Sequence, residues 1–305
     1  MPLSNNSFGF MKMTKSHSIS RYAPTPSGYL HFGNIYSFIL TYHIAKKENA
    51  KTLLRIDDLD KERTKNNFLH DIFNTLDFLE IPYDLGPKNF SDFKSNYSQL
   101  SRMSLYKEAL ENLKTKKLIF ACDCSRKKIL KSNPKGFYNG FCRNKKLDFN
   151  KSDAAWRVAT PKDIEVNLND YSGVTVSGKL PSLLSDFIVR KKDGFPSYQL
   201  ASLVDDLHFG VDLIVRGKDL YGSSLAQVYL ADIMGKNDFP KSTFYHHQII
   251  KNENKEKLSK SAGSTSVFYL RNQGKKKSEV YQALAELLGL QGTFTQLQDF
   301  SILVK

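Results

Sequence analysis

Three segments of the chain carry residue types that together suit the binding and activation of a nucleotide. The first, RYAPTPSGYLHFGN, runs from Arg21 to Asn34 and holds a histidine between two glycines. The second, LRIDDLDKER, ends at Arg63, and the third, KLSKS, begins at Lys257. A strand that enters a glycine-containing turn and then a helix binds anions through backbone N–H groups and the helix dipole. Each segment alone is a weak signal, but the three in this order indicate a phosphate-binding site.

Individual side chains in these segments suit separate tasks. His31, at the head of the expected helix, is placed to donate to a phosphate oxygen, and Gly33 leaves room for a flat ring beside the backbone. Lys257 and Lys260 are suited to closing over phosphates and neutralising charge as it develops. Two plainer interpretations stay open on the residues alone. A single histidine is more often structural, and a Lys/Ser-rich loop is usually a solvated surface.

The three cysteines of the chain, Cys122, Cys124 and Cys142, fall within one short window of sequence. An odd and small number of cysteines argues against the disulfide framework of a secreted protein. Three thiolates with one nitrogen or oxygen donor form an ordinary tetrahedral structural zinc site. The pattern therefore favours a zinc centre, with three free, partly buried thiols as the alternative.

The elements that must position these residues alternate between strand and helix. We predict a strand from Ser18 into the turn, a helix with the apolar stripe Ile35, Phe38, Ile39 and Tyr42, a buried strand at Lys51–Ile56, and a helix with the stripe Phe68, Ile72, Leu76 and Leu79. Strand–helix–strand units of this length imply a parallel sheet. Functional residues are then expected at the carboxyl ends of its strands.

Further along, a helix at Ser98–Leu113 leads into the cysteine window and a basic, loop-like stretch that is typical of an insertion. We predict that strands at Ser185–Arg190 and Val211–Gly217 form the second half of the same sheet. Near the end of the chain, Val280, Leu284 and Leu288 predict a helix within Ser278–Leu290.

Composition limits the classes of protein that fit. Lys+Arg 45 against Asp+Glu 31 gives a formal net charge of +14 in 305 residues, which attracts polyanions such as nucleic acid. No apolar run reaches the ~20 residues that a membrane span needs. The first residues lack the features of a signal peptide. We therefore expect a cytoplasmic protein with a flexible leader at residues 1–17, a polyanionic partner and no membrane association.

The segments resemble the signatures of class I aminoacyl-tRNA synthetases. Arg21–Asn34 resembles their HIGH-type signature, with Asn34 in place of the final histidine, and Lys257–Ser261 resembles their KMSKS signature. RYAPTPSGYLHFGN and LRIDDLD are similar to the glutamyl and glutaminyl subgroup in particular. The similarity continues through YQLASLVDD (Tyr198–Asp206) and VDLIVRGKDL (Val211–Leu220), so it covers residues 20 to 263.

The resemblance implies an α/β fold: a Rossmann-type parallel sheet, the class I synthetase catalytic core, split by a zinc-binding insertion and followed by a short helical extension. The expected division is a first Rossmann half at 18–105, an acceptor-type zinc insertion at 106–184, a second half at 185–240, and the KMSKS-type loop with a helical extension at 241–305. No anticodon-binding domain is expected, because only 44 residues follow Ser261.

The resemblance also implies roles for particular residues. His31, Lys257 and Lys260 would be catalytic. ATP, used with Mg²⁺, would be bound by Pro24, Ser27, Gly28, His31, Gly33, Lys257, Ser259 and Lys260. One structural zinc ion per chain would be held by Cys122, Cys124, Tyr138 and Cys142, since Cys-x-Cys followed by Tyr-x3-Cys resembles the zinc site of glutamyl-type synthetases.

The amino acid pocket is implied in the same way. The family's substrate contacts correspond to Arg21, Asp57, Tyr198 and Arg216. Arg216 suits a bidentate grip on a side-chain carboxylate, which favours glutamate. Asp57 departs from the glutamyl pattern, because glutamyl relatives usually carry Glu there and glutaminyl relatives Asp. A structural ion pair is the alternative role for Arg216.

A catalytic core of this length with this cysteine pattern resembles the short glutamyl-queuosine tRNA(Asp) synthetases. The resemblance implies activation of glutamate with ATP and its transfer to the queuosine base in the anticodon stem-loop of tRNA(Asp), by an enzyme that we expect to be a monomer. Two alternatives are a truncated glutamyl-tRNA synthetase paralogue that loads another acceptor and an inactive tRNA-binding paralogue. Retention of His31, Lys257 and Lys260 argues against the inactive form.

Overall fold

The computed structural model describes residues 16–250 and 266–304. Lys257, Ser259 and Lys260 lie outside this range, as does nearly all of the expected leader. The helices in chain order are α1 (Phe32–Lys47), α2 (Asn66–Phe78), α3 (Phe90–Asp92), α4 (Met103–Thr115), α5 (Arg126–Ser132), α6 (Tyr198–His208), α7 (Tyr221–Met234), α8 (Val267–Asn272) and α9 (Lys277–Leu287).

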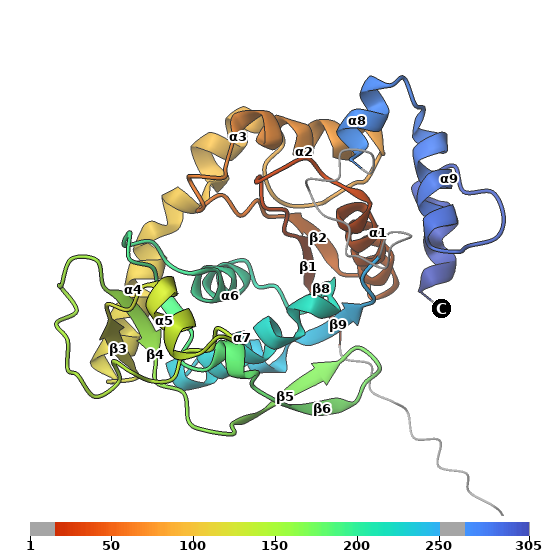
Figure 1. Cartoon of the computed structure of the whole chain (residues 1–305). Helices are drawn as coiled ribbons and strands as arrows, with labels where there is room; N and C mark the ends of the chain where they lie inside the picture. The colour runs from red at the N-terminus through yellow and green to blue at the C-terminus, as the bar shows by residue number, and fades with distance from the viewer. Residues whose placement is uncertain (1–15, 251–265, 305) are drawn as a thin grey trace, which may run out of the picture.

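A six-stranded sheet forms the centre of the molecule, in the order β2-β1-β8-β9-β5-β6 (Figure 1). Its strands are β1 (Ile19–Tyr22), β2 (Lys51–Leu54), β5 (Glu165–Asp170), β6 (Thr175–Lys179), β8 (Leu213–Gly217) and β9 (Thr243–His247). All neighbouring pairs are parallel except β5 and β6, which form an antiparallel hairpin. The prediction of a parallel sheet is confirmed, and the carboxyl ends of β1, β2, β8 and β9 meet at one edge.

Helices cover both faces of this sheet, which explains why its central strands are almost continuously apolar. Leu213 and Val215 of β8 pack with Leu40 and Ile44 of α1 on one face. The intervening Ile214 points the other way, into a core shared with α4, α6 and α7. Alternate residues of one strand therefore bury themselves under different helices, as in a doubly wound Rossmann-type fold.

A second, three-stranded antiparallel sheet pairs β3 (Ile119–Cys122), β4 (Ala155–Val158) and β7 (Ile188–Arg190) in the order β3-β4-β7. The prediction that Ser185–Arg190 belongs to the parallel sheet is therefore wrong. Ile188 pairs with Arg157 of β4, so this short strand closes the sheet that carries the cysteines. Its apolar run is equally compatible with either sheet, because a strand's sequence does not name its pairing partner. The hairpin β5–β6, within the expected insertion, belongs to the central sheet instead.

The last helices pack against the first ones. Tyr281 of α9 donates from its hydroxyl to the Leu79 carbonyl at 2.6 Å, and Arg271 of α8 forms an ion pair with Asp71 of α2 at 2.8 Å. Val280 and Leu284 are buried here, which confirms the helix predicted from their spacing. The predicted helix at Ser98–Leu113 begins instead with a 3-10 turn at Gln99–Arg102. Within the described residues, no helix is long and apolar enough to cross a membrane.

Candidate active site

A cavity of about 310 Å³ lies at the edge where β1, β2, β8 and β9 end. Its walls include seven of the residues predicted from the sequence: Arg21, Pro24, His31, Gly33, Asp57, Tyr198 and Arg216. Ser27 and Gly28 lie in the same turn, between β1 and α1, without lining the cavity. The arrangement follows from the parallel sheet, which brings residues from distant parts of the chain to one rim.

The N-terminus of α1 forms one side of the cavity. His31 is the N-cap residue, and its Nδ1 accepts from the Gly33 N–H at 3.0 Å. In return, Oδ1 of Asn34 accepts from the His31 N–H at 3.1 Å, which completes a capping box. A Cβ at position 33 would lie 2.9 Å from Cε1 of His31, so the histidine ring itself requires the glycine. Asn34, in place of the signature histidine, thus acts in fixing the helix start.

Buried charges form the opposite side. Asp206 of α6 accepts from Arg21 Nε at 3.1 Å and from Arg55 Nη1 at 2.5 Å through the same oxygen. Arg55 also grips both oxygens of Asp57, at 2.8 and 3.1 Å. All of these side chains are buried. Asp57 therefore lines the cavity as a carboxylate already paired with Arg55, and its predicted contact with the substrate ammonium group stays a prediction.

Arg216 is a buried charged residue that the described protein groups satisfy only in part. Its side chain is 3% exposed, and Nη1 donates to Oε1 of Gln227 at 2.9 Å. Nε and Nη2 have no hydrogen-bond partner among the described residues, and the nearest carboxylate oxygen, on Asp206, is 3.9 Å from Nη2. Burial and the neighbouring Arg21 lower the pKa of Arg216 to about 10. A carboxylate bound at the free Nε–Nη2 edge would accept the missing hydrogen bonds and would raise the lowered pKa of Arg216.

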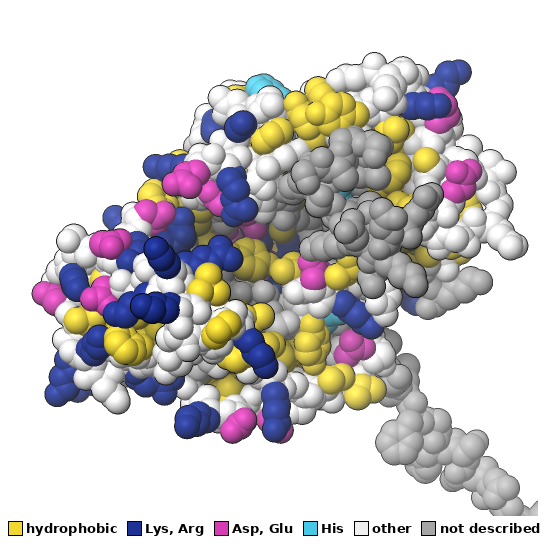
Figure 2. Space-filling view, viewed as in Figure 1, with side chains coloured by type: hydrophobic (Ala, Val, Ile, Leu, Met, Phe, Trp, Pro, Cys, Tyr) yellow, Lys and Arg dark blue, Asp and Glu magenta, His cyan; other side chains and the backbone are white. Residues whose placement is uncertain are grey.

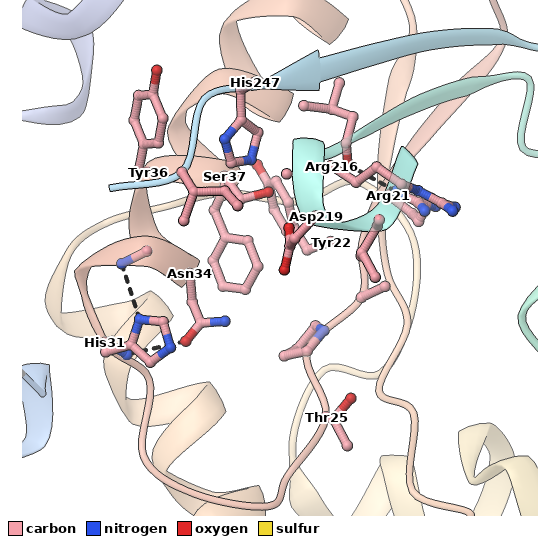
Figure 3. Close-up of a pocket in the computed structure, with 18 of the residues that line it drawn as sticks. Arg21, Tyr22, Thr25, His31, Asn34, Tyr36, Ser37, Arg216, Asp219 and His247 are labelled. Carbon is pink, nitrogen blue, oxygen red and sulfur yellow. Dashed lines mark hydrogen bonds between the residues drawn. The ribbon is translucent and has the colours of Figure 1, made fainter. Parts of the chain in front are cut away.

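Figure 3 shows the two ends of the cavity. His31 and Asn34 lie on one side, Arg21 and Arg216 lie on the other, and the Asp219 side chain points into the space between them. A helix N-terminus at one end suits a phosphate, and an unsatisfied guanidinium at the other suits a carboxylate. The cavity can therefore hold a nucleotide and an acidic small molecule in contact with each other.

The described residues on both sides of the Lys257–Ser261 signature lie at this cavity. Ile250 lines it, sixteen positions before Ser266. Ser266 forms an isolated β-bridge with His31, and the Val267 N–H donates to the Leu30 carbonyl at 3.0 Å. The described chain thus stops at the cavity wall before the signature and resumes beside His31 after it.

Sequence reasoning missed several residues that support the site. They are Asn34, Arg55, Asp206, Asp219, Ser224, Gln227 and His247. The available signal was the placement of charged residues inside apolar elements, such as Arg55 within KTLLRI and Asp206 at the end of YQLASLVDD. Buried charges of this kind are seldom found without a partner. Asp205, next to Asp206, instead pairs with Arg102 at 2.8 Å and supports the wall from behind.

A separate cluster of thiols lies at the end of β3. The Sγ atoms of Cys122, Cys124 and Cys142 are buried and lie within 4.8 Å of one another. The distance of 3.5 Å between Cys124 and Cys142 Sγ excludes a disulfide, whose bond is about 2.05 Å long. Ligand sulfurs about 2.3 Å from a tetrahedral ion would be about 3.8 Å apart, so the cluster fits a metal ion. Burial raises the pKa of Cys124 to about 12, and a bound cation would offset this.

Tyr138 belongs to the same cluster. Its ring is buried, and its hydroxyl oxygen accepts from the Cys142 N–H at 2.7 Å. The guanidinium of Arg157 lies 4.0 Å from the centre of the ring. The tyrosine oxygen is thus held beside the thiols, and its role as the fourth ligand stays a prediction.

The doubly wound sheet, the histidine at the start of α1 and the buried arginine pocket define the catalytic core of a class I aminoacyl-tRNA synthetase. Residues 19–300 match the family described as tRNA synthetases class I (E and Q), catalytic domain. The chain belongs to this family and is a ligase of the aminoacyl-tRNA synthetase type. Enzymes of this class use ATP.

Individual relatives are similar over most of the chain. The glutamyl-Q tRNA(Asp) synthetase of Pseudomonas syringae is 34% identical over 249 residues, which cover 82% of this chain and 79% of the relative. The protein of the same name from Acinetobacter baylyi is 35% identical over 79% of this chain and 77% of its own length. The solved glutamate-tRNA synthetase of Elizabethkingia anophelis is 26% identical, with a TM-score of 0.67. The match covers 81% of this chain but only 53% of that structure, about half of its length.

Proposed function

We propose that the protein activates glutamate with ATP and transfers it to the queuosine base of tRNA(Asp). The reaction has two steps. An oxygen of the glutamate α-carboxylate forms a bond to the α-phosphorus of ATP, and the bond from that phosphorus to the pyrophosphate oxygen breaks. A hydroxyl of the acceptor then attacks the activated carbonyl, and AMP leaves.

The observation that carries the glutamate assignment is the free Nε–Nη2 edge of Arg216. A side-chain carboxylate would supply the two hydrogen-bond acceptors that this buried guanidinium lacks. The amide of glutamine offers one acceptor and a donor that opposes the guanidinium, so it would leave the site partly unsatisfied. Arg21, Asp57 and Tyr198 would hold the remainder of the amino acid. Tyr198, at 42% exposure, is the most exposed of these three side chains.

ATP would lie with its phosphates at the start of α1, next to His31 and Pro24, and would bring its own Mg²⁺. Ser27 and Gly28 belong to the turn that leads there. Lys257, Ser259 and Lys260 are proposed to act on the phosphates because the described chain borders the cavity on both sides of them. Positioning and charge stabilisation then account for the catalysis, and the loss of one such donor costs on the order of 10²–10³ in rate.

The acceptor assignment rests on the names of the relatives, which are called glutamyl-Q tRNA(Asp) synthetases. The solved glutamate-tRNA synthetases that the fold resembles are about twice as long as the matched region. We propose that zinc is the metal of the cysteine cluster, with Tyr138 as the fourth ligand. A monomeric state and a cytoplasmic location stay predictions.

Locating the glutamate on the RNA tests this proposal. Radiolabelled glutamate, ATP and the protein are incubated with tRNA(Asp) that contains queuosine or the unmodified guanosine, and the product is digested with nuclease. We expect label on the anticodon fragment, and only with the modified tRNA. Label at the 3′ terminal adenosine would show that the protein is a 3′-end synthetase, and loading of glutamine in place of glutamate would refute the assignment of Arg216.

A further inference from the structure

A half-exposed phenylalanine lies between two lysines on the cysteine-bearing loop. Phe141 directly precedes Cys142 and is 50% exposed. The Nζ atoms of Lys128 and Lys145 lie 4.5 and 4.0 Å from the centre of its ring. The two exposed lysine side chains lie over the ring, so a base that stacks on Phe141 would displace an ammonium group, which then stays accessible to a phosphate.

The surrounding surface is strongly basic. From Arg126 to Lys146 the sequence holds eight Lys or Arg residues and no Asp or Glu, more than half of the net charge of +14. Figure 2 shows Lys and Arg side chains gathered over the end of the molecule that carries α5, with hydrophobic side chains and some Asp or Glu side chains between them. Interleaved cationic and apolar groups are typical of surfaces that bind unpaired nucleotides, whose phosphates and bases need both.

This surface continues toward the active site. A hollow of about 650 Å³ begins at α5 and has largely apolar walls, with the partly or fully exposed cations Arg126, Lys135, Lys191 and Lys192 and the buried Arg157 among its lining residues. Leu130 and Leu183 in its wall are exposed, at 43% and 66%.

Lys191 also lines a second hollow, of about 290 Å³, together with Arg63. Phe195 lies next to Lys191, partly buried against the core, with the Nζ atoms of Lys61 and Lys191 at 4.7 and 5.6 Å from its ring centre. The second hollow shares Thr25, Asp57 and Tyr198 with the active-site cavity. Two lysine-flanked phenylalanines thus mark a path that ends where the activated amino acid would lie.

We infer that this path, from Phe141 through Lys191 to Tyr198, binds unpaired nucleotides of the RNA substrate and leads the acceptor base to the active site. The inference rests on the proposed function, because it takes RNA as the partner. The bases would stack on Phe141 and Phe195, and the lysines would contact the phosphates between them. A folded protein partner would not require this alternation of aromatic rings and cations, whereas a strand of RNA repeats a base and a phosphate at each nucleotide.

Binding of a fluorescent hairpin with an unpaired seven-nucleotide loop, measured by anisotropy against salt concentration, tests the path. We expect Phe141→Ala to weaken binding about tenfold, because a stacked base contributes of that order. Phe141→Trp should retain the affinity. The double variant Lys128→Gln/Lys145→Gln should reduce the slope of log affinity against log salt by about 1.4, since each single-strand phosphate contact contributes about 0.7.

Matched controls lie away from the path. Ile302→Ala removes a similarly exposed apolar side chain (46%) near the C-terminus, and Lys241→Gln removes an exposed lysine before the amino end of β9, opposite the active-site edge. Both should bind the hairpin as the wild type does. A fully paired duplex of equal charge should show no difference between Phe141→Ala and wild type. The zinc content of each variant shows whether the loop is intact. If Phe141→Ala loses its metal, the salt slope of the lysine variant, which leaves the thiol cluster untouched, decides the question.

The path is refuted if metal-replete Phe141→Ala and the lysine variant both bind the hairpin with wild-type affinity and salt slope. The proposed function is tested by a different measurement, the position of the glutamate label on the tRNA. A wild-type protein that labels the 3′ end while Phe141→Ala binds the hairpin tenfold more weakly would overturn the acceptor assignment and support the path.

Discussion

Two buried arginines of the site differ in how far the protein itself satisfies them. Arg55 binds Asp57 and Asp206 with well-formed hydrogen bonds, whereas Arg216 keeps one guanidinium edge without a partner. Unmade hydrogen bonds of a buried cation cost free energy, so Arg216 destabilises the protein in the absence of substrate. Substrate binding therefore favours an arginine at position 216, whereas the stability of the substrate-free protein favours a neutral residue there.

Replacement of Arg216 by glutamine should abolish recognition of glutamate without destabilising the fold. The loss of two charge-assisted hydrogen bonds should raise the KM for glutamate on the order of 10²-fold or more. The melting temperature without substrate should stay equal or rise, because an unsatisfied buried charge is removed. Glutamate-dependent ATP–pyrophosphate exchange and thermal unfolding measure the two effects, and an unchanged KM would contradict the assignment.

Arg55→Gln is the matched variant with the opposite expectation. It leaves Asp57 with no cation partner among the described residues and removes one of the two close pairs of Asp206. Breaking a buried pair of this kind costs about 3–5 kcal/mol. We expect a clear fall in the free energy of unfolding, measured by urea denaturation. A loss of stability in Arg216→Gln as large as in Arg55→Gln would show that both arginines are structural.

At the scale of the element, the start of α1 depends on an arrangement of three residues. His31 and Asn34 cap the helix reciprocally, and Gly33 is the residue that leaves space for the histidine ring. The cap and the proposed phosphate site share the same N–H groups, so a change in one must affect the other.

Gly33→Ala should therefore impair ATP use through His31. The added Cβ would lie 2.9 Å from Cε1 of His31 and force the ring out of its cap. We expect the KM for ATP to rise roughly tenfold, as for the loss of one hydrogen bond to a charged group, with a small drop in melting temperature. Lys47→Ala, in the last turn of the same helix, should change neither value. Exchange kinetics that match the wild type in Gly33→Ala would show that His31 does not take part in binding ATP.

The three-stranded sheet is a second element with its own support. Among the described residues, its three strands pair with one another and with no strand of the central sheet, and Cys122 is the last residue of β3. A metal at this position would hold together a loop region that carries few apolar residues.

Removal of the proposed zinc ion should consequently weaken RNA binding more than glutamate activation. After treatment with a chelator, we expect faster proteolysis between β3 and β4 and a loss of hairpin affinity of at least tenfold, while pyrophosphate exchange falls less than twofold. The readouts are limited proteolysis, anisotropy and exchange on one sample. Equal losses in binding and exchange would mean that the metal supports the whole catalytic core.

At the scale of the whole molecule, three histidines couple folding to pH: His43 and His247 are buried, and His246 is partly buried. Burial lowers the pKa of His43 and His247, and burial beside Arg216 lowers the pKa of His246 to about 4. In the unfolded chain a histidine binds its proton near pH 6.5. Between these values the unfolded state binds more protons than the folded state, so stability is full above about pH 6.5 and falls as the pH is lowered.

The melting temperature should thus decrease from pH 7.5 to pH 5.0. Each neutral histidine contributes up to about 1.4 kcal/mol of unfolding free energy per pH unit in this range. His246→Gln should flatten the dependence, because one of the three groups is removed. Calorimetry across the range measures the slope, and a protein equally stable at both pH values would show that these histidines are not buried in the neutral form.

Local patterns in the sequence determined much of this structure. The apolar periodicity predicts α1, α2 and α9, and the segments RYAPTPSGYLHFGN and LRIDDLD identify the cavity residues and the family, because helix stripes and turn chemistry depend on neighbours within a few positions. The three cysteines likewise indicate their own cluster by spacing alone.

Strand pairing and the unsatisfied charges depend on contacts between distant parts of the chain, which no local pattern in the sequence encodes. Ile188–Arg190 belongs to the three-stranded sheet, and β5–β6 belongs to the central one. Strand pairing depends on the neighbouring strands and the faces they bury, and not on the sequence of one strand alone. The free edge of Arg216 follows from where Asp206, Gln227 and Arg55 lie in space, residues between 10 and 161 positions from it. Hydrogen-bond satisfaction is a sum over spatial neighbours, and these are set by the fold and not by the order of the chain.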